Sequence, residues 1–202
     1  MKDCLIVGQA NVGKTLFLIN FAGFMGIKKL EVCTRYPDGT QQYMAYPPDQ
    51  ARKVLVDAAP HKTRCLHSLV LTVPRGKVKR NFRITDTCGL TDQIHQDEDV
   101  RKAMAQTLSY LKGAEIVLHM VDAAAVGRAG GVDAVGEIDL QVARFASYYA
   151  QYAMLANKMD LPMARVGLIK LKEEFRRHHI IPVSALEKRG FTEVKAFVAR
   201  HL

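Results

Sequence analysis

The chain has 202 residues, 49% of them hydrophobic and 24% charged, which suffices for one α/β domain with a sizeable core. It carries 29 basic and 20 acidic side chains, and the net charge of +9 permits a polyanionic partner without identifying one. No apolar run reaches membrane-spanning length, the first residues lead directly into an apolar segment, and the four cysteines follow no metal or disulfide spacing. We therefore expect a cytoplasmic protein without a signal peptide, membrane span or disulfide framework.

The first element in chain order is a short apolar segment, Cys4–Val7, which predicts a buried strand. It leads into Gly8-Gln9-Ala10-Asn11-Val12-Gly13-Lys14-Thr15 and then into a helical pattern. Strand, Gly-x-x-x-x-Gly-Lys-Thr and helix together predict a P-loop in its required context. In a P-loop, backbone N–H groups surround a phosphate chain and the helix directs its positive end at it. Lys14 then supplies a charge for the outer phosphates, and Thr15 a hydroxyl ligand for Mg²⁺.

A long segment rich in Pro, Tyr and Gln follows, from about residue 28 to 62. Within it, residues 49–59 predict a short helix capped by Asp49. A connection of this length between two core elements is usually functional or mobile. We therefore expect a functional insertion or a mobile loop here.

The remaining elements alternate between predicted strands and helices. Residues 66–73 and 81–85 predict two strands joined by the turn at 74–77. Apolar runs predict further strands at 116–121, 153–156 and 179–183. Periodic segments predict helices at 97–112, 138–149, 163–177 and 192–202. The Ala/Gly-rich residues 123–136 predict a loop. This order predicts a Ras-like α/β fold: a mostly parallel, doubly wound sheet with one antiparallel edge strand and helices on both faces.

Three further motifs each follow a predicted strand, at the sheet edge where ligands bind in open α/β folds. The Asp-x-x-Gly motif at Asp86–Gly89 supplies a carboxylate that can hold Mg²⁺ through water and an amide that can contact a γ-phosphate. The motif Asn157–Asp160 supplies a carboxylate able to accept two hydrogen bonds from guanine, which adenine cannot offer. The motif Ser184–Leu186 supplies backbone N–H groups that can face guanine O6. Each motif alone is weak, but the four in order predict a guanine-nucleotide site.

With these motifs, the chain resembles the P-loop GTPase superfamily and, within it, the bacterial Era/TrmE-like group, over essentially its whole length. The matching motifs are Gly8-x-x-Asn11-Val12-Gly13-Lys14-Thr15, Asp86-Thr87-x-Gly89-Leu90, and Ser184-Ala185-Leu186 with Gly190. The resemblance implies a Ras-like G domain over residues 1–202 that binds Mg²⁺ and GTP, hydrolyses GTP slowly to GDP, and switches two loops.

The leading interpretation is a molecular switch that acts through an effector protein or a ribosomal particle, for example in ribosome assembly. The alternative is a guanine-nucleotide-binding regulatory module with negligible hydrolysis. The motifs assign phosphate binding to Gly8, Asn11, Val12, Gly13, Lys14, Thr15 and Gly89, and guanine binding to Asn157, Lys158, Asp160, Ser184, Ala185 and Leu186.

A threonine in the first switch loop should join Thr15 and Asp86 at Mg²⁺, and two threonines qualify. Thr34 lies at the usual distance from the P-loop, whereas Thr63 lies directly before the strand that pairs with the Asp86 strand. Pairing between the two strands fixes the position of Thr63 relative to Asp86 more firmly than the separation along the chain fixes that of Thr34, which favours Thr63. Residues 28–62 then form an insertion in switch I, either a structural flap or a partner surface.

Catalysis is less clearly specified, because Ras-type enzymes place a water-orienting Gln directly after the glycine that corresponds to Gly89 of the Asp-x-x-Gly motif. Here that residue is Leu90, and the nearby Gln93, His95 and Gln96 are interpreted as solvated loop residues. Potassium-stimulated members of the resembled group carry an asparagine ligand at the position of Asn11. The resemblance therefore implies K⁺ as a second cofactor, with Lys14 and the Asn11-bound ion as catalytic groups. The other interpretation is that Asn11 only stabilises the loop.

The predicted hairpin at 75–83 carries five basic residues and no acidic one. Such a surface can contact RNA phosphates. Lysine and arginine also protect an exposed edge strand from aggregation, and the scarcity of aromatic residues favours that simpler interpretation.

Overall fold

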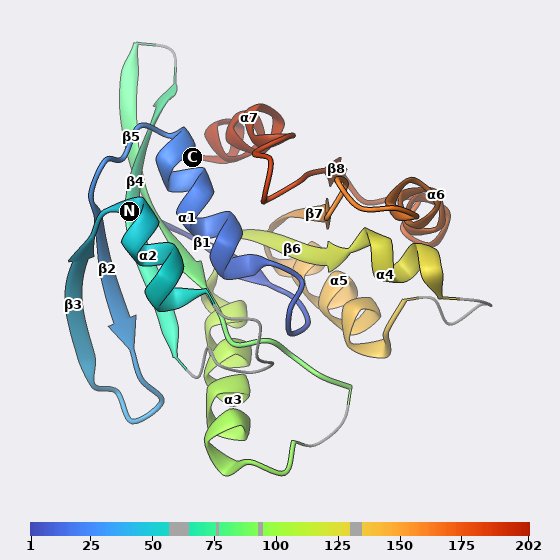
Figure 1. Cartoon of the computed structure of the whole chain (residues 1–202), viewed down its shortest axis with the longest axis horizontal. Coiled ribbons are helices and arrows are strands. Elements are labelled where there is room, and N and C mark those ends of the chain that lie inside the picture. Colours follow the sequence, from blue (N-terminus) through green and yellow to red (C-terminus); the bar gives the residue numbers. More distant parts are fainter. Residues whose placement is uncertain (57–64, 76, 93–94, 130–134) are drawn as a thin grey trace.

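The structure is a computed structural model that describes residues 1–56, 65–75, 77–92, 95–129 and 135–202 (Figure 1). The described residues form an eight-stranded sheet in the order β3-β2-β4-β5-β1-β6-β7-β8. The strands are β1 (Lys2–Val7), β2 (Leu30–Arg35), β3 (Gln41–Tyr46), β4 (Leu66–Arg75), β5 (Val78–Asp86), β6 (Ile116–Asp122), β7 (Gln151–Asn157) and β8 (Ile180–Pro182). The helices are α1 (Lys14–Phe24), α2 (Pro48–Leu55), α3 (Glu98–Gly113), α4 (Ala123–Arg128), α5 (Glu137–Tyr149), α6 (Ala164–Glu174) and α7 (Phe191–His201).

The predicted mostly parallel, doubly wound sheet is confirmed. Strand β1 is parallel to both β5 and β6, and β7 and β8 continue the parallel part. The antiparallel part is larger than the expected single edge strand, because β4, β2 and β3 all alternate in direction. Alternating burial along β2, with Leu30, Val32 and Thr34 inward, is the period-2 pattern of a strand.

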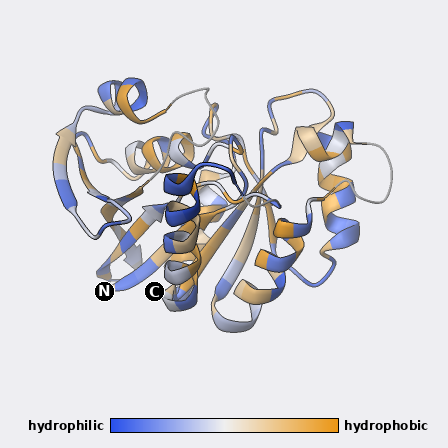
Figure 2. Cartoon of the chain, turned by 90° about the horizontal axis from the view of Figure 1, so that it is seen from below, coloured by the Kyte–Doolittle hydropathy of each residue, from blue (hydrophilic) through white to orange (hydrophobic). Residues whose placement is uncertain are grey.

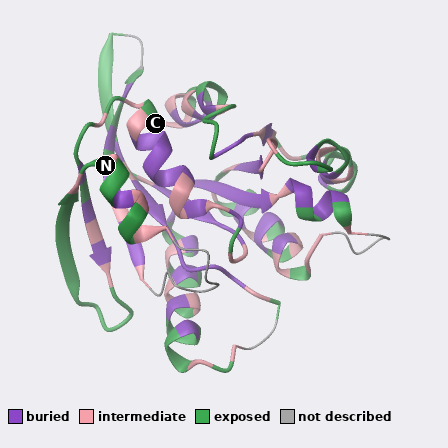
Figure 3. Ribbon diagram, in the orientation of Figure 1, coloured by how far each residue is buried: buried purple, intermediate pink, exposed green. Residues whose placement is uncertain are grey.

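Helices cover both faces of the sheet. The first face carries α1 and α7, where Phe17, Phe21 and Phe191 pack together against residues of β1 and β6. The second face carries α3, α5 and α6, which cover the alternate side chains of β1, β6 and β7. The apolar central strands and their burial are visible in Figures 2 and 3. The predicted motifs therefore lie at the carboxyl ends of strands that are packed between two layers of helices.

The prediction of a loop over residues 123–136 is wrong in its first part. Residues Ala123–Arg128 form α4, whose N-terminus is capped by Asp122 Oδ1 accepting from the amide of Ala125 at 2.9 Å. Gly127, one of the glycines that suggested a loop, serves helix packing instead. A Cβ on Gly127 would lie 2.0 Å from the Met163 carbonyl oxygen, so only glycine permits this approach of α4 to α6.

The β4–β5 hairpin extends beyond the rest of the sheet, at the top left of Figure 1. Strand β2 pairs with β4 only over Leu66–Ser68, and β1 meets β5 only from Phe82 onwards. Lys77, Lys79 and Arg80 are exposed near its tip. Within the described ranges, no helix combines the length and apolar character needed to cross a membrane.

Candidate nucleotide-binding site

The P-loop lies between the end of β1 and the start of α1, with Lys14 folded back across it. The Nζ of Lys14 donates to the carbonyl oxygens of Gly8 at 3.1 Å and Gln9 at 2.6 Å. Burial lowers the pKa of Lys14, while the carboxylate of Asp86 acts in the opposite direction. The ammonium group is thus held inside the loop that a phosphate chain would occupy.

The predicted magnesium ligands Thr15 and Asp86 lie together. The hydroxyl of Thr15 donates to Oδ2 of Asp86 at 2.6 Å. Asp86 is fully buried, and among the described residues its Oδ1 has no hydrogen-bond partner. A buried, unpaired carboxylate oxygen beside a hydroxyl suits Mg²⁺, which prefers hard oxygen ligands and is usually held by one or two carboxylates with substrate phosphates. The residues present therefore fit the ion.

Sequence reasoning missed His67, which lies directly across from Asp86 in the β4–β5 ladder. Its Nδ1 is 3.8 Å from Oδ2 of Asp86, and its Nε2 is 3.5 Å from Sγ of Cys65. Burial lowers the pKa of His67, but Asp86 and Cys65 favour the charged form more strongly and raise the pKa to about 10. The only available signal was strand register, because His67 lies in the predicted strand 66–73 and Asp86 directly follows its predicted partner strand 81–85.

At the other end of the site, Asn157 joins the P-loop to the loop after β8. Its Nδ2 donates to the carbonyl oxygen of Val12 at 2.7 Å, and its Oδ1 accepts from the amide of Ala185 at 2.9 Å. The side chain is 2% exposed, so both hydrogen bonds are shielded from water. Asn157 therefore fixes the spacing between two of the four motifs.

The carboxylate predicted to read guanine is oriented by the neighbouring motif. The hydroxyl of Ser184 donates to Oδ1 of Asp160 at 2.5 Å and accepts from the amide of Glu187 at 3.0 Å. Lys158 has a left-handed φ of 64°, and its Nζ forms a 2.7 Å ion pair with Asp122. The Asn157–Asp160 and Ser184–Leu186 motifs are thus tied together, while Leu186 is exposed.

The Asp86–Gly89 motif passes close to the P-loop at Gly89. A Cβ on Gly89 would lie 2.5 Å from Cα of Ala10, a contact that only glycine avoids. The next amide, of Leu90, donates to the carbonyl oxygen of Gly8 at 3.1 Å. The Leu90 side chain is buried in the cluster that includes Leu111 of α3. It therefore packs into the core rather than projecting from the loop.

The two switch I candidates differ in what the structure describes. Thr63 lies outside the described residues. Thr34 is buried in β2, opposite His67, which is itself opposite Asp86. Two strand spacings place the Thr34 backbone roughly 10 Å from that of Asp86, too far for both side chains to share one ion directly.

The residues considered for catalysis show three different situations. Asn11 is exposed and has a left-handed φ of 60°, a conformation that asparagine adopts more readily than most residues. The Nδ1 of His95 accepts from the amide of Asp97 at 3.1 Å, and the carbonyl oxygen of Gln96 accepts from Arg101 at 2.7 Å. These two residues are thus engaged locally at the start of α3. Gln93 lies outside the described residues.

The family model described as 50S ribosome-binding GTPase matches residues 3–158 of this chain. The chain belongs to this family. The match covers the P-loop, Asp86–Gly89 and the start of the Asn157 motif, which agrees with the resemblance drawn from the sequence. The predictions of a P-loop GTPase and of a Ras-like G-domain fold are confirmed.

Two curated relatives align with part of the chain. It is 28% identical to GTPase Obg of Shouchella clausii over 155 residues, covering 73% of this chain and 36% of Obg. It is 33% identical to the tRNA modification GTPase MnmE of Chlorobium phaeobacteroides over 121 residues, covering 58% of this chain and 23% of MnmE. The chain thus matches about a third or less of the length of these relatives.

Among solved structures, the chain resembles Era in complex with MgGDPNP and nucleotides 1506–1542 of 16S ribosomal RNA. The TM-score is 0.68 at 20% identity, and the match covers 100% of this chain and 56% of that Era chain. At this identity the likeness establishes the fold.

Proposed function

We propose that this protein binds Mg²⁺ and GTP and hydrolyses GTP to GDP and phosphate, as a molecular switch that acts through a partner. The observation that carries the proposal is Asn157, whose two buried hydrogen bonds join the P-loop to the Ser184–Leu186 loop. It holds the phosphate end and the base end of the site at a fixed spacing. The 2.6 Å hydrogen bond between Thr15 and Asp86 supports the metal assignment at the phosphate end.

In this proposal, each side chain has a defined task. Lys14 neutralises charge on the outer phosphates, and the carboxylate of Asp160 accepts two hydrogen bonds from guanine. Ser184 holds that carboxylate in orientation through its 2.5 Å hydrogen bond. The magnesium ion, when bound at Thr15, Asp86 and a switch I threonine, neutralises charge on the phosphates. The proposed phosphate-binding backbone residues are Gly8, Asn11, Val12, Gly13 and Gly89; Asn157, Lys158, Ala185 and Leu186 complete the guanine pocket.

We assign residues 1–202 to a single G domain and the segment at 28–62 to an enlarged switch I. Strands β2 and β3 and helix α2 fall within this segment. Thr63 remains the proposed switch I threonine, because Thr34 is separated from Asp86 by the width of β4.

The absence of a glutamine at Leu90 motivates a second proposed cation. Asn11 is exposed on the P-loop, where its side-chain carbonyl is available to a K⁺ ion beside the phosphates. A fixed cation there would offset charge that develops during phosphoryl transfer, as an arginine finger does. Hydrolysis is then slow without K⁺ or without a partner.

We propose a ribosomal particle or an effector associated with it as the partner. The family description names ribosome binding, and the solved Era complex contains 16S ribosomal RNA. The exposed Lys77, Lys79 and Arg80 at the projecting hairpin supply positive charge for RNA phosphates.

Phosphate release under single-turnover conditions tests the proposed hydrolysis. With Mg²⁺ and K⁺, the parent protein should release phosphate from GTP, not from ATP, and Lys14→Ala should abolish release. Tight GTP binding without release in either salt, even with ribosomal particles added, would instead identify a regulatory module without turnover. The buried Leu90 is the observation that favours this second candidate.

A further inference from the structure

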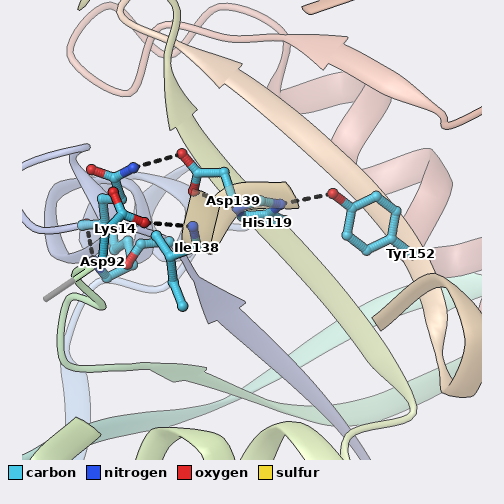
Figure 4. A network of polar contacts seen from close by, with 8 residues as sticks. Lys14, Asp92, His119, Ile138, Asp139 and Tyr152 are labelled. Atoms are coloured by element: carbon cyan, nitrogen blue, oxygen red, sulfur yellow. Dashed lines mark hydrogen bonds and ion pairs between the residues drawn. The ribbon is translucent and has the colours of Figure 1, made fainter. Parts of the chain in front are cut away.

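A chain of four polar side chains links the P-loop to the interior of the sheet (Figure 4). Nε2 of Gln9, in the P-loop, donates to Oδ2 of Asp139 at 2.9 Å. Oδ1 of Asp139 lies 2.9 Å from Nε2 of His119, and Nδ1 of His119 lies 2.7 Å from the hydroxyl of Tyr152. These four residues, here called the Asp139 network, come from the P-loop, α5, β6 and β7.

The centre of the network, Asp139 and His119, is buried, whereas Gln9 and Tyr152 are half-buried. Asp139 is 4% exposed and His119 is 0% exposed. A carboxylate removed from water is costly unless it is paired and hydrogen-bonded, and here both oxygens of Asp139 have a partner. A satisfied polar network in a low-dielectric interior fixes the geometry of its members. Moving Gln9 away would leave one oxygen of Asp139 without this partner.

Gln9 connects the network to Lys14. While its side chain donates to Asp139, its carbonyl oxygen accepts from Nζ of Lys14 at 2.6 Å. Burial lowers the pKa of Lys14, and Asp139 is among the nearby negative groups that act in the opposite direction. The same residue therefore contacts the buried carboxylate through its side chain and the lysine of the P-loop through its backbone carbonyl.

The first turn of α5 also contacts the segment that follows the Asp86–Gly89 motif. Oδ1 of Asp92 accepts from the amide of Ile138 at 2.5 Å, one residue before Asp139. Gln9 and Leu90 form an isolated parallel bridge between the P-loop and the segment that follows Gly89. The start of α5 thus contacts both the P-loop, through Asp139, and the segment after Gly89, through the amide of Ile138.

We propose that Asp139 is a positioning residue for Lys14. The Asp139 network holds Gln9, and its carbonyl holds the lysine ammonium in the orientation from which it contacts the outer phosphates. The inference rests on the proposed nucleotide site. It predicts that disrupting the network weakens binding of a γ-phosphate and slows hydrolysis, with less effect on affinity for GDP.

Two variants break the contact to Gln9 without altering the buried pair of Asp139 and His119. Gln9→Leu removes the donor. Gly136→Ala places a Cβ 2.4 Å from Nε2 of Gln9 and so displaces its amide; the same Cβ lies 3.1 Å from Oδ2 of Asp92, and the φ of −66° at this position suits alanine. Matched controls make the same chemical changes elsewhere: Gln141→Leu on the exposed face of α5, and Gly113→Ala, where a Cβ would meet no atom within 4 Å.

The measurements are the dissociation constants of GDP and a non-hydrolysable GTP analogue, the single-turnover rate constant, and urea unfolding for each variant. We expect both network variants to lower the rate constant about ten- to a hundred-fold, as misplaced catalytic groups do. Affinity for the GTP analogue should fall about tenfold, with GDP affinity changed by less than about threefold.

If rate constants and GTP-analogue affinities stay within about twofold of the controls, the network only stabilises the fold and the proposal is overturned, whatever the loss in unfolding free energy. If the parent binds both nucleotides but releases no phosphate, the proposed hydrolysis fails. The comparison of GTP-analogue and GDP affinities still tests the role of Asp139 in that case.

Discussion

Replacing Asn157 with alanine tests the connection between the two ends of the site. The substitution removes a donor 2.7 Å from the Val12 carbonyl and an acceptor 2.9 Å from the Ala185 amide. Both backbone groups then lose their hydrogen-bond partner in a region shielded from water, because Asn157 is only 2% exposed. Each buried polar group left unsatisfied costs about 1–3 kcal/mol, so the loss of two partners should lower the unfolding free energy by about 2–6 kcal/mol.

Urea unfolding monitored by circular dichroism measures this loss. Because the loss is a large fraction of the stability of a typical domain, the measurement is made at low temperature, where the variant remains folded without urea. Asn81→Ala is a matched control, since Asn81 accepts an exposed hydrogen bond from Thr72 at 2.8 Å. The control should lose less than about 0.5 kcal/mol, as most exposed substitutions do. A loss of that size in Asn157→Ala would show that Asn157 does not hold the two loops together, and would refute the reasoning.

Four further predictions concern the nucleotide, the ions and pH. Asp160→Asn should lose GTP affinity and gain affinity for xanthosine nucleotides, because an amide donor then faces guanine N1–H; competitive titration of both nucleotides measures this. Thr63→Ala should weaken Mg²⁺-dependent binding of a GTP analogue with little change for GDP, whereas Thr34→Ala should leave both unchanged. Hydrolysis should be faster in KCl than in NaCl at equal ionic strength, and Asn11→Ala should remove the difference. Without nucleotide and Mg²⁺, the stability that His67 contributes relative to His67→Gln should be complete below pH 6.5 and disappear as the pH rises towards about 10, because its pKa is raised in the folded state.

Each of these has a contrary result. Undiminished GTP binding by Asp160→Asn would remove the guanine assignment, and a Thr34→Ala variant that loses the GTP analogue would move switch I to β2. Equal rates in the two salts would return Asn11 to a structural role. A pH-independent difference between the parent and His67→Gln in urea unfolding would mean that His67 is not charged beside Asp86.

The places of the four motifs after strands of the sheet were predictable because each motif is a local pattern with its own backbone requirement. Gly13-Lys14-Thr15 needs a strand before it and a helix after it, and both are visible in the surrounding hydrophobic pattern. The parallel order of β1, β6 and β7 followed from alternating elements in the same way.

The parts that could not be predicted depend on pairing between distant segments. Gln9 and Asp139 are 130 positions apart, and nothing local marks Asp139 as more than a polar residue in the first turn of a helix. The partnership of His67 with Asp86 follows from antiparallel register, which a one-residue slip would change. Strand β3 was missed because it is almost entirely exposed and lacks the alternation that identifies a strand, whereas β2 does alternate and was overlooked within the long segment at 28–62.

The ratio of GDP to ADP affinity tests most directly whether the site selects guanine through Asp160. In Mg²⁺, GDP should bind at least about a hundred-fold more tightly than ADP, since adenine would leave the carboxylate without its two donors. Equal affinities for GDP and ADP in the parent protein would show that the site does not select guanine.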